Sequence, residues 1–488
     1  MEARLLEPAG AFKVVGFMTK DRPITRREFL RTAGRTGLTV GLAAGLGGVL
    51  GSCSDESDVS NTIATIGTTQ GGASTTVATT AERGREIKIG VVSARSGPLA
   101  LFGKADEWWT QHAALVCSQG VVCGDNKLHQ PVFVVEDSRS DPERAAGAAS
   151  RLIAEAQVDV IITSGNARLV NAVAERAEAL GCPCLSGFHQ WRPFVHDRGD
   201  RSLAPFRWTY AHAQGLEDIA AVYLAMWEQL PTNRMVGFVF QNDANGRLWA
   251  DSRTGLPPAA ESAGYEGVLP DPVPAGEDDY SKCIGELVRD GCEVCCAVMP
   301  ASDFIAFWKR ALELDFRPKI VTAGDALAFP QALEAMGPRA RNLTAECLWH
   351  PSWPYADSLT GSSAQQLAED YMAKTGELWI APLAQYSKFE WAVDVFKRVA
   401  DVDSKEAFVA EVRRTKVDTC LGRIDFTLPV GTAGVAGSAR PADNVCKAPV
   451  SGVQWVAGGA LEFQPTIVAN NGWPTLPAAG RVVPLDYD

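Results

Sequence analysis

The sequence feature that most constrains the fold is an alternation of short apolar runs with amphipathic helical segments, which begins near residue 86. The first apolar run lies within residues 87–92, and a helical pattern that contains Trp108, Ala113 and Val116 follows it. Strands of about four to six residues that alternate with helices of about 12 to 16 are typical of parallel sheets built from βαβ units. We therefore predict an α/β fold whose first buried strand opens the folded part of the chain.

The alternation runs to about Thr209 and starts again with a strongly amphipathic helix at Leu216. Two consecutive series of this kind predict two similar Rossmann-like lobes, each with a parallel central sheet. Strands are predicted at residues 87–92, 131–136, 158–163, 183–186, 206–209, 235–240, 265–269, 294–298 and 319–322. Helices between them are predicted at residues 142–156, 168–180, 216–230, 248–263, 280–289 and 303–314.

In the last third of the chain, the pattern predicts strands and helices that add to the two sheets already formed. They are strands at 343–348 and 421–426, helices at 364–374, 383–399 and 406–413, a Gly/Ala/Pro-rich loop at 427–449, and a hairpin at 453–468. A 488-residue chain with 46% hydrophobic residues is long enough for two or three domains.

The N-terminal leader contains Arg26-Arg27 ahead of an apolar, glycine-rich stretch at residues 37–49. That stretch is too short for a good membrane span, and the pattern resembles a twin-arginine export signal, which carries folded proteins across the inner membrane. Residues 50–53 resemble a lipoprotein cleavage box, so we expect a lipid anchor on Cys53. An ordinary exported protein without the lipid is the alternative.

Residues 54–85 are rich in Ser, Thr, Gly and Ala and contain almost no bulky apolar side chain, which is typical of a flexible linker. Together with a signal at 1–53, the linker predicts a protein that is anchored to the outer face of the cell membrane, or is periplasmic, after export. Met18 is an alternative to Met1 as the true start.

The charge of the chain excludes two classes of partner. The leader has eight basic and four acidic residues, so the rest of the chain carries a net charge of −16. A body this acidic argues against nucleic acid or an anionic membrane surface as its partner.

Eleven cysteines remain when Cys53 is set aside. Outside the cytoplasm they can form disulfides, and three pairs are close enough in sequence to do so. These pairs are Cys117/Cys123, Cys283/Cys292 and Cys420/Cys446. Cys182/Cys184 and Cys292/Cys295/Cys296 leave a zinc or redox site open. Neither group has a second pair or a histidine at ligand spacing, so we predict no metal and no cofactor.

The predicted ligand-binding residues come from loops that follow the strands, where parallel sheets receive ligands. In the first series they are Ser96, Gly97, Leu99, Phe102, Ser164, Gly165, Asn166, Phe188 and His189. In the second series and after it they are Asp243, Asn245, Ala301, Asp325 and Trp349. Hydroxyls, amides and glycines suit an anion or amide, whereas carboxylates suit a cation, so a zwitterion between the lobes matches both sets.

Several of these residues also have plainer explanations. Ser96 and Gly97 fit a turn before a helix, and Asp325 fits a helix N-cap. His189 fits a histidine that lies near a ligand without contacting it, and Trp349 fits packing at a hinge.

From about Glu86 to the C-terminus, the chain resembles the extracytoplasmic substrate-binding proteins of branched-chain amino-acid ABC transporters, the Leu/Ile/Val-binding type with the type I periplasmic-binding fold. The resemblance is carried by IKIGVVSARSGPLALFG at 87–103, SDPERAA at 140–146, the Ser164 loop and QNDANG at 241–246. The chain departs from the family at Phe188 and His189, where small residues and a threonine are usual. A different amide, acid or aromatic ligand therefore stays open.

The resemblance implies two lobes joined by three hinge crossovers near Thr209, Cys347 and Arg423. The first lobe would comprise residues 86–209 and 347–423, and the second 210–346 and 424–488. It also implies a monomer that binds a small molecule by hinge closure and delivers it to the permease and ATPase subunits of an ABC transporter.

Two other function classes are alternatives to transport. A ligand-sensing subunit of a membrane receptor shares the fold, and a neighbouring permease and ATPase would separate the two. An exported hydrolase finds little support, because the chain has no HExxH, GxSxG or GxxxxGK[ST] motif and its six histidines are scattered. We predict that the protein is not an enzyme.

Overall fold

The computed structural model describes residues 81–198, 206–431, 440–458 and 463–487, all within one compact unit, Ala78–Asp488. The predicted signal with Cys53 and all but the last residues of the predicted linker lie outside the described residues. Within them, no helix is long and apolar enough to cross a membrane.

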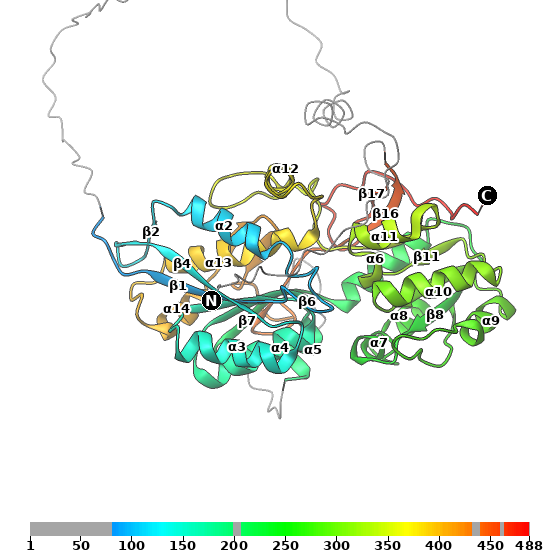
Figure 1. Ribbon diagram of the computed structural model, residues 1–488, viewed down its shortest axis with the longest axis horizontal. Coiled ribbons are helices and arrows are strands. Elements are labelled where there is room, and N and C mark those ends of the chain that lie inside the picture. The colour runs from blue at the N-terminus through cyan, green and yellow to red at the C-terminus, as the bar shows by residue number, and fades with distance from the viewer. Residues whose placement is uncertain (1–80, 199–205, 432–439, 459–462, 488) are drawn as a thin grey trace, which may run out of the picture. The chain divides into compact units, whose positions relative to one another are not determined.

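The first of two large sheets contains six strands, all paired in parallel, in the order β15-β7-β6-β5-β1-β4 (Figure 1). Its strands are β1 (Ile87–Ser93), β4 (Pro131–Asp137), β5 (Val160–Ser164), β6 (Cys184–Gln190), β7 (Thr209–Gln214) and β15 (Val445–Lys447). The interior strands are buried along almost their whole length because helices cover both faces of the sheet.

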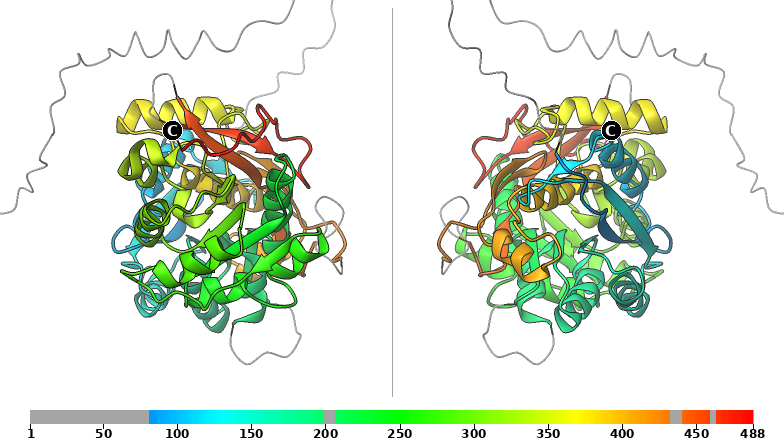
Figure 2. Two further views of the ribbon diagram at one scale, coloured as in Figure 1. Left: turned by 90° about the vertical axis from the view of Figure 1, so that its right-hand side faces the viewer. Right: turned by 90° about the vertical axis from the view of Figure 1, so that its left-hand side faces the viewer.

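Helices α3 (Pro142–Ala154) and α4 (Ala167–Leu180) cover one face of this sheet, and α2 (Asp106–Val116) and α13 (Tyr386–Phe396) cover the other (Figure 1). The same separation is visible from two further directions, with α12 (Ala364–Thr375, yellow) on the side away from α3 and α4 (cyan) (Figure 2). Shorter elements complete this region. They are β2 (Val121–Val122), β3 (Leu128–His129), α5 (Trp191–His196), η3 (Ala381–Gln385), α14 (Lys405–Val412), β13 (Lys416–Thr419) and β14 (Gly422–Asp425).

The second sheet contains seven strands in the order β17-β16-β12-β11-β10-β8-β9. Strands β8 to β12 are parallel, and β16 and β17 extend the sheet as an antiparallel hairpin. The strands are β8 (Met235–Phe240), β9 (Glu266–Val268), β10 (Val294–Val298), β11 (Ile320–Thr322), β12 (Thr344–Cys347), β16 (Ser451–Ala457) and β17 (Phe463–Ala469).

Alternate residues of these strands enter two different cores. Val236 and Phe238 of β8 pack with α6, α7 and α8, whereas Val239 packs on the opposite side with α9 and α10. The helices of this region are α6 (Leu216–Trp227), α7 (Ala244–Trp249), α8 (Leu256–Ser262), α9 (Ser281–Arg289), α10 (Ala301–Glu313), α11 (Pro330–Met336), η1 (Asp325–Leu327) and η2 (Gly337–Ala340).

The described chain passes between the two sheets three times: at Gly215, after Cys347, and between Lys447 and Ser451. The third passage differs from the prediction near Arg423. It comes later because β15, inside the predicted loop 427–449, pairs with β7 in the first sheet. A three-residue strand in a Gly/Ala/Pro-rich segment has too little periodicity to be recognised. We accordingly propose a first lobe of residues 86–214 and 348–447.

Two predicted elements are wrong in a way that matters for the site. The helix predicted at 248–263 is split into α7 and α8, because the Asp251 carboxylate accepts hydrogen bonds from the N–H groups of Arg253 and Thr254 and so forms a turn. The fourth strand continues to Gln190, so the predicted loop at 187–190 belongs to β6.

Candidate functional site

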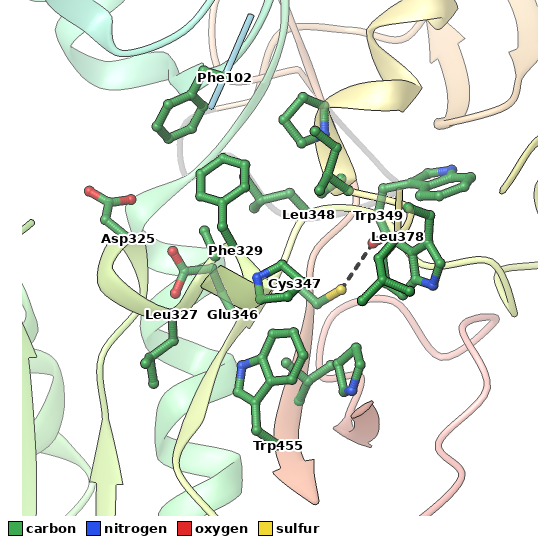
Figure 3. Close-up of a pocket in the computed structure, with 18 of the residues that line it drawn as sticks. Phe102, Asp325, Leu327, Phe329, Glu346, Cys347, Leu348, Trp349, Leu378 and Trp455 are labelled. Atoms are coloured by element: carbon green, nitrogen blue, oxygen red, sulfur yellow. Dashed lines mark hydrogen bonds between the residues drawn. The ribbon is translucent and has the colours of Figure 1, made fainter. Parts of the chain in front are cut away.

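A pocket of about 810 Å³, partly open to solvent, is lined by residues of both lobes. Phe102 and Phe188 come from the first lobe. Asp325, Glu346 and Trp455, which Figure 3 labels, come from the second. The other lining residues are Leu327, Ala328, Phe329, Pro330, Cys347, Leu348, Trp349, Leu378, Trp379, Ile380, Ala381, Pro382, Val453, Phe463 and Pro465. The apolar character of its lining is typical of small-molecule sites.

Phe102 brings the two lobes into contact at the pocket. It lies in the turn before α2, and its ring meets Phe329 edge-on with 5.1 Å between ring centroids. Such edge-to-face pairs are favourable arrangements of aromatic rings. Phe102, one of the predicted ligand-binding residues, therefore lines the pocket.

Phe188 forms another part of the first-lobe wall. Its φ of +58° is rare for a residue with a side chain, and it coincides with an irregularity in the pairing of β6 with β7. Behind the ring, the Lys388 ammonium lies 4.8 Å from its centroid and 3.2 Å from the Ser387 hydroxyl oxygen. Lys388 is fully buried, and desolvation lowers its pKa to about 7.

Two carboxyl groups lie on the second-lobe side of the pocket. Asp325 begins η1 and is exposed, and Glu346 on β12 is half-buried. In Figure 3 both carboxyls lie on the same side of the pocket, beside the ring of Phe329. Asn245 donates a hydrogen bond to Asp325 over 2.8 Å, and the Tyr223 hydroxyl donates to Glu346.

The surroundings of these carboxyls favour their neutral forms. Desolvation and the nearby Asp325 charge raise the pKa of Glu346 to about 7. Protein atoms that displace water also raise the pKa of Asp325, although its side chain remains open to solvent. Gly324 makes room for this arrangement, because a Cβ there would collide with Glu346 and with the Tyr223 hydroxyl.

Trp349 both lines the pocket and packs where the chain passes between the sheets after β12. A place in the binding site and packing at a hinge, the two predictions for this residue, are therefore compatible. It is fully buried, its Nε1 donates to the carbonyl oxygen of Cys420 over 3.0 Å, and its ring meets Trp379 edge-on at 5.8 Å.

Residues of the first predicted loop contribute to local structure outside the pocket lining. The Ser96 hydroxyl donates to Asp137 over 2.7 Å, and the backbone N–H of Leu99 donates to the Ser140 hydroxyl. Gly97 has a φ of +87° and a contact with the carbonyl oxygen of Arg139 that leaves no space for a Cβ. This matches the turn alternative for Ser96 and Gly97.

The loop after β5 is likewise used by its own helix. The Asn166 side chain caps α4 by accepting a hydrogen bond from the backbone N–H of Leu169. Ser164 is buried at the end of β5, and Gly165 turns the chain with a φ of +125°. None of the three lines the pocket.

His189 is not part of the pocket lining and lies in a buried cluster. Its Nε2 lies 3.0 Å from the Ser186 hydroxyl and its ring lies 5.2 Å from that of Phe194. Burial lowers its pKa to about 4.

In the second lobe, Asn245 does not line the pocket but donates a hydrogen bond to Asp325, which does. Asp243 caps α7 by accepting a hydrogen bond from the backbone N–H of Gly246. Ala301 is the first residue of α10 and does not line the pocket. Asp325 starts a short 3-10 helix without forming a side-chain cap, which leaves its carboxyl available.

A sequence model described as a periplasmic binding protein matches residues 86–438. The chain belongs to the periplasmic binding protein family. No curated protein matches it.

Solved structures show the same fold as this periplasmic binding protein. The leucine-binding protein LivK of Thermotoga maritima has a TM-score of 0.60 at 19% identity, over 79% of this chain and 99% of its own. A type 1 periplasmic binding protein of Bordetella pertussis scores 0.62 at 15% identity, over 78% of this chain and 100% of its own. A solute-binding protein of Rhodopseudomonas palustris, solved with 3,4-dihydroxybenzoic acid, scores 0.61 at 14% identity over 82% and 98%. The predicted type I α/β fold is confirmed.

Several pocket residues of this periplasmic binding protein were missed from the sequence. Glu346 lies inside a strand rather than in a loop, Trp455 lies in the predicted hairpin, and Trp379 lies between two predicted helices. The available signal was Glu346, the one charged residue in the predicted strand 343–348. A charged residue in a buried strand indicates a partner or a site.

The described cysteines are all free thiols and buried, including the three pairs considered as disulfides. Burial raises the pKa of Cys184 and holds those of Cys295 and Cys296 well above the ordinary value, so these thiols are unreactive. Among the described residues, no group of three or more His, Cys, Asp or Glu side chains could hold a metal ion.

Proposed function

We propose that this periplasmic binding protein captures a small molecule in the pocket between its lobes and delivers it to the permease and ATPase of an ABC transporter. The observation that carries the proposal is the pocket itself, which takes its walls from both lobes. Phe102 and Phe188 lie on one side of it, and Asp325 and Glu346 on the other. A ligand there would bind better to a closed arrangement of the lobes than to an open one, and so shift the protein toward closure.

The hinge would consist of the three passages between the sheets. At two of them, Lys447 on β15 forms ion pairs with Asp218 at 2.6 Å and Glu217 at 3.0 Å, both on α6. The Trp191 indole N–H donates to Glu217 over 2.8 Å. These contacts tie the first-lobe edge strand to the first helix of the second lobe, which suits a hinge that bends without separating.

The family implies a location outside the cytoplasm. Lipid attachment at Cys53 and twin-arginine export remain predictions, and membrane fractionation tests the first. We expect the full-length protein in the membrane fraction and a Cys53→Ser variant in the soluble fraction. A Cys53→Ser variant that stays in the membrane fraction would contradict the anchor.

Closure itself is tested by solution scattering. A thermal-shift screen of amino acids, amides, amines and small acids first selects a compound that raises the melting temperature. At saturating concentrations of that compound we expect a smaller radius of gyration than for the free protein. An unchanged scattering profile would contradict hinge closure. Light scattering in the same experiment tests the predicted monomer.

A further inference from the structure

We propose that the pocket selects an organic cation, a molecule with an apolar body and a net positive charge. This inference rests on the proposed function and names the ligand class for the same site. It differs from the sequence-based expectation of a zwitterion.

The first observation is that both carboxyls in the pocket have only neutral partners. Asp325 accepts from the Asn245 amide and Glu346 accepts from the Tyr223 hydroxyl. Among the described residues, no Lys, Arg or His forms an ion pair with either carboxyl. A cationic guest would supply the countercharge that these two adjacent carboxyls lack, and so would stabilise their ionised forms.

The second observation concerns the basic residues. Within the described lining of the pocket, no side chain is Lys, Arg or His, so nothing there offers an ionic partner to a ligand carboxylate. The Lys388 ammonium lies 4.8 Å from the centroid of the Phe188 ring, but it is fully buried and is not part of the lining. A zwitterion or an anion would therefore lose the hydration of its carboxylate without an ionic replacement.

The third observation is the aromatic lining. Phe102, Phe329 and Trp455 stand around the carboxyl side of the pocket, and Trp349 lies farther along it (Figure 3). Trp379 also lines the pocket and meets the Trp349 ring edge-on. The faces of aromatic rings attract cations, and the effect is largest where water is excluded. The same rings provide apolar area for the body of the ligand.

The fourth observation points to an acceptor atom on the ligand. Trp455 is 6% exposed and lines the pocket, and its Nε1 has no hydrogen-bond partner among the described residues. In Figure 3 the ring nitrogen is on the side of the indole on which the two carboxyls lie. A buried donor without a partner is costly, so an oxygen on the ligand would satisfy it.

The test uses four probes with the same hydroxyphenyl body and different head groups. Tyramine is a cation, tyrosol is its neutral alcohol, tyrosine is a zwitterion, and 3-(4-hydroxyphenyl)propanoate is an anion. Isothermal titration calorimetry at pH 7.5 compares their dissociation constants on the full chain. We expect tyramine to bind about tenfold or more tightly than each of the other three.

Charge-neutral variants then assign the effect to the two carboxyls. Glu346→Gln and Asp325→Asn keep the shape of each side chain, and each should weaken tyramine about tenfold or more while changing tyrosol about twofold at most. Glu261→Gln is the matched control, because Glu261 is exposed on α8 and does not line the pocket. It should leave all four affinities unchanged. Circular dichroism verifies that each variant is folded.

The outcomes separate this inference from the proposed function. If tyrosol, tyrosine or the propanoate binds as tightly as tyramine, or if both variants leave tyramine binding unchanged, the cation assignment is overturned and solute capture stands. If none of the four binds but a neutral, anionic or zwitterionic compound from the thermal-shift panel does, the assignment is again overturned. If neither the probes nor any panel compound binds, the proposed function itself is overturned.

Discussion

The two sides of the pocket use their polar residues in opposite ways. On the first-lobe side, Ser96 bonds to Asp137, Asn166 caps α4 and His189 pairs with Ser186, so the wall that remains is apolar. On the second-lobe side, Asp325 and Glu346 keep their carboxyls at the pocket. A polar residue after a strand is therefore available to a ligand only when the adjacent turn or helix does not already use it.

The largest difference between the two sides should appear when Asp325 is removed. Asp325→Ala should weaken the binding of an amine such as tyramine by about 2 kcal/mol or more, because a charge partner inside the pocket is lost. Titration calorimetry measures this, with thermal unfolding as the check on stability. An unchanged affinity would remove Asp325 from the site and with it the contrast between the two sides.

Acid titration provides the next effect. Because the pKa of Glu346 is about 7, protonation of this carboxyl competes with the binding of a cation. As the pH is lowered from about 7, tyramine affinity should fall by up to about tenfold per pH unit. Above about pH 7 it should be nearly constant. The groups that face Glu346 are Tyr223 from α6, Cys296 from β10 and Asp325 from η1. Tyr223 and Cys296 stay protonated at neutral pH because their pKa values are raised well above the ordinary range.

The same shift makes a prediction for the free protein. The pKa of Glu346 in the folded state lies above its ordinary value of 4.5, so its contribution to the free energy of unfolding is full below about pH 4.5 and is lost as pH rises through 7. Glu346→Gln should flatten both this dependence and that of tyramine binding. A pH profile of binding that Glu346→Gln leaves unaltered would assign the titration to another group.

A smaller effect, on stability rather than binding, is expected on the first-lobe side. Asn166→Ala removes the cap of α4 and should lower the free energy of unfolding by about 1 kcal/mol. Its affinity for any pocket ligand should change by less than about twofold, since no hydrogen bond to the ligand is lost. Chemical denaturation and calorimetry together measure both quantities. A large loss of affinity at unchanged stability would place Asn166 in the site after all.

The smallest effect is expected at His189. Its pKa of about 4 keeps the imidazole neutral above about pH 5. His189→Gln should therefore leave the pH dependence of tyramine binding between about pH 5.5 and 8 unchanged. If this variant abolishes the dependence instead, the first lobe carries the titrating group.

Much of the fold was predictable, because buried strands and amphipathic helices carry their own periodicity. The βα series from residue 86 and its restart at Leu216 correspond to the two sheets. The third passage between the sheets was not predictable, because β15 has only three residues and pairs with a strand more than two hundred residues earlier. Pairing over such a distance leaves no local signal.

The site was less predictable than the fold. Phe102, Phe188, Asp325 and Trp349 were expected and line the pocket. Ser96 and Asn166 have the residue types of a ligand loop, but a serine in a turn and an asparagine before a helix look the same whether they bind a ligand or their own backbone. Glu346 was missed because its strand gave no reason to expect an exposed carboxyl.

The most direct test of the account is a crystal structure of the protein with tyramine. The account predicts tyramine between the two lobes, with its ammonium at hydrogen-bond distance from Asp325 or Glu346 and its ring among Phe102, Phe188 and Phe329. Tyramine bound outside this pocket, or inside it with the ammonium turned away from both carboxyls, would contradict the account.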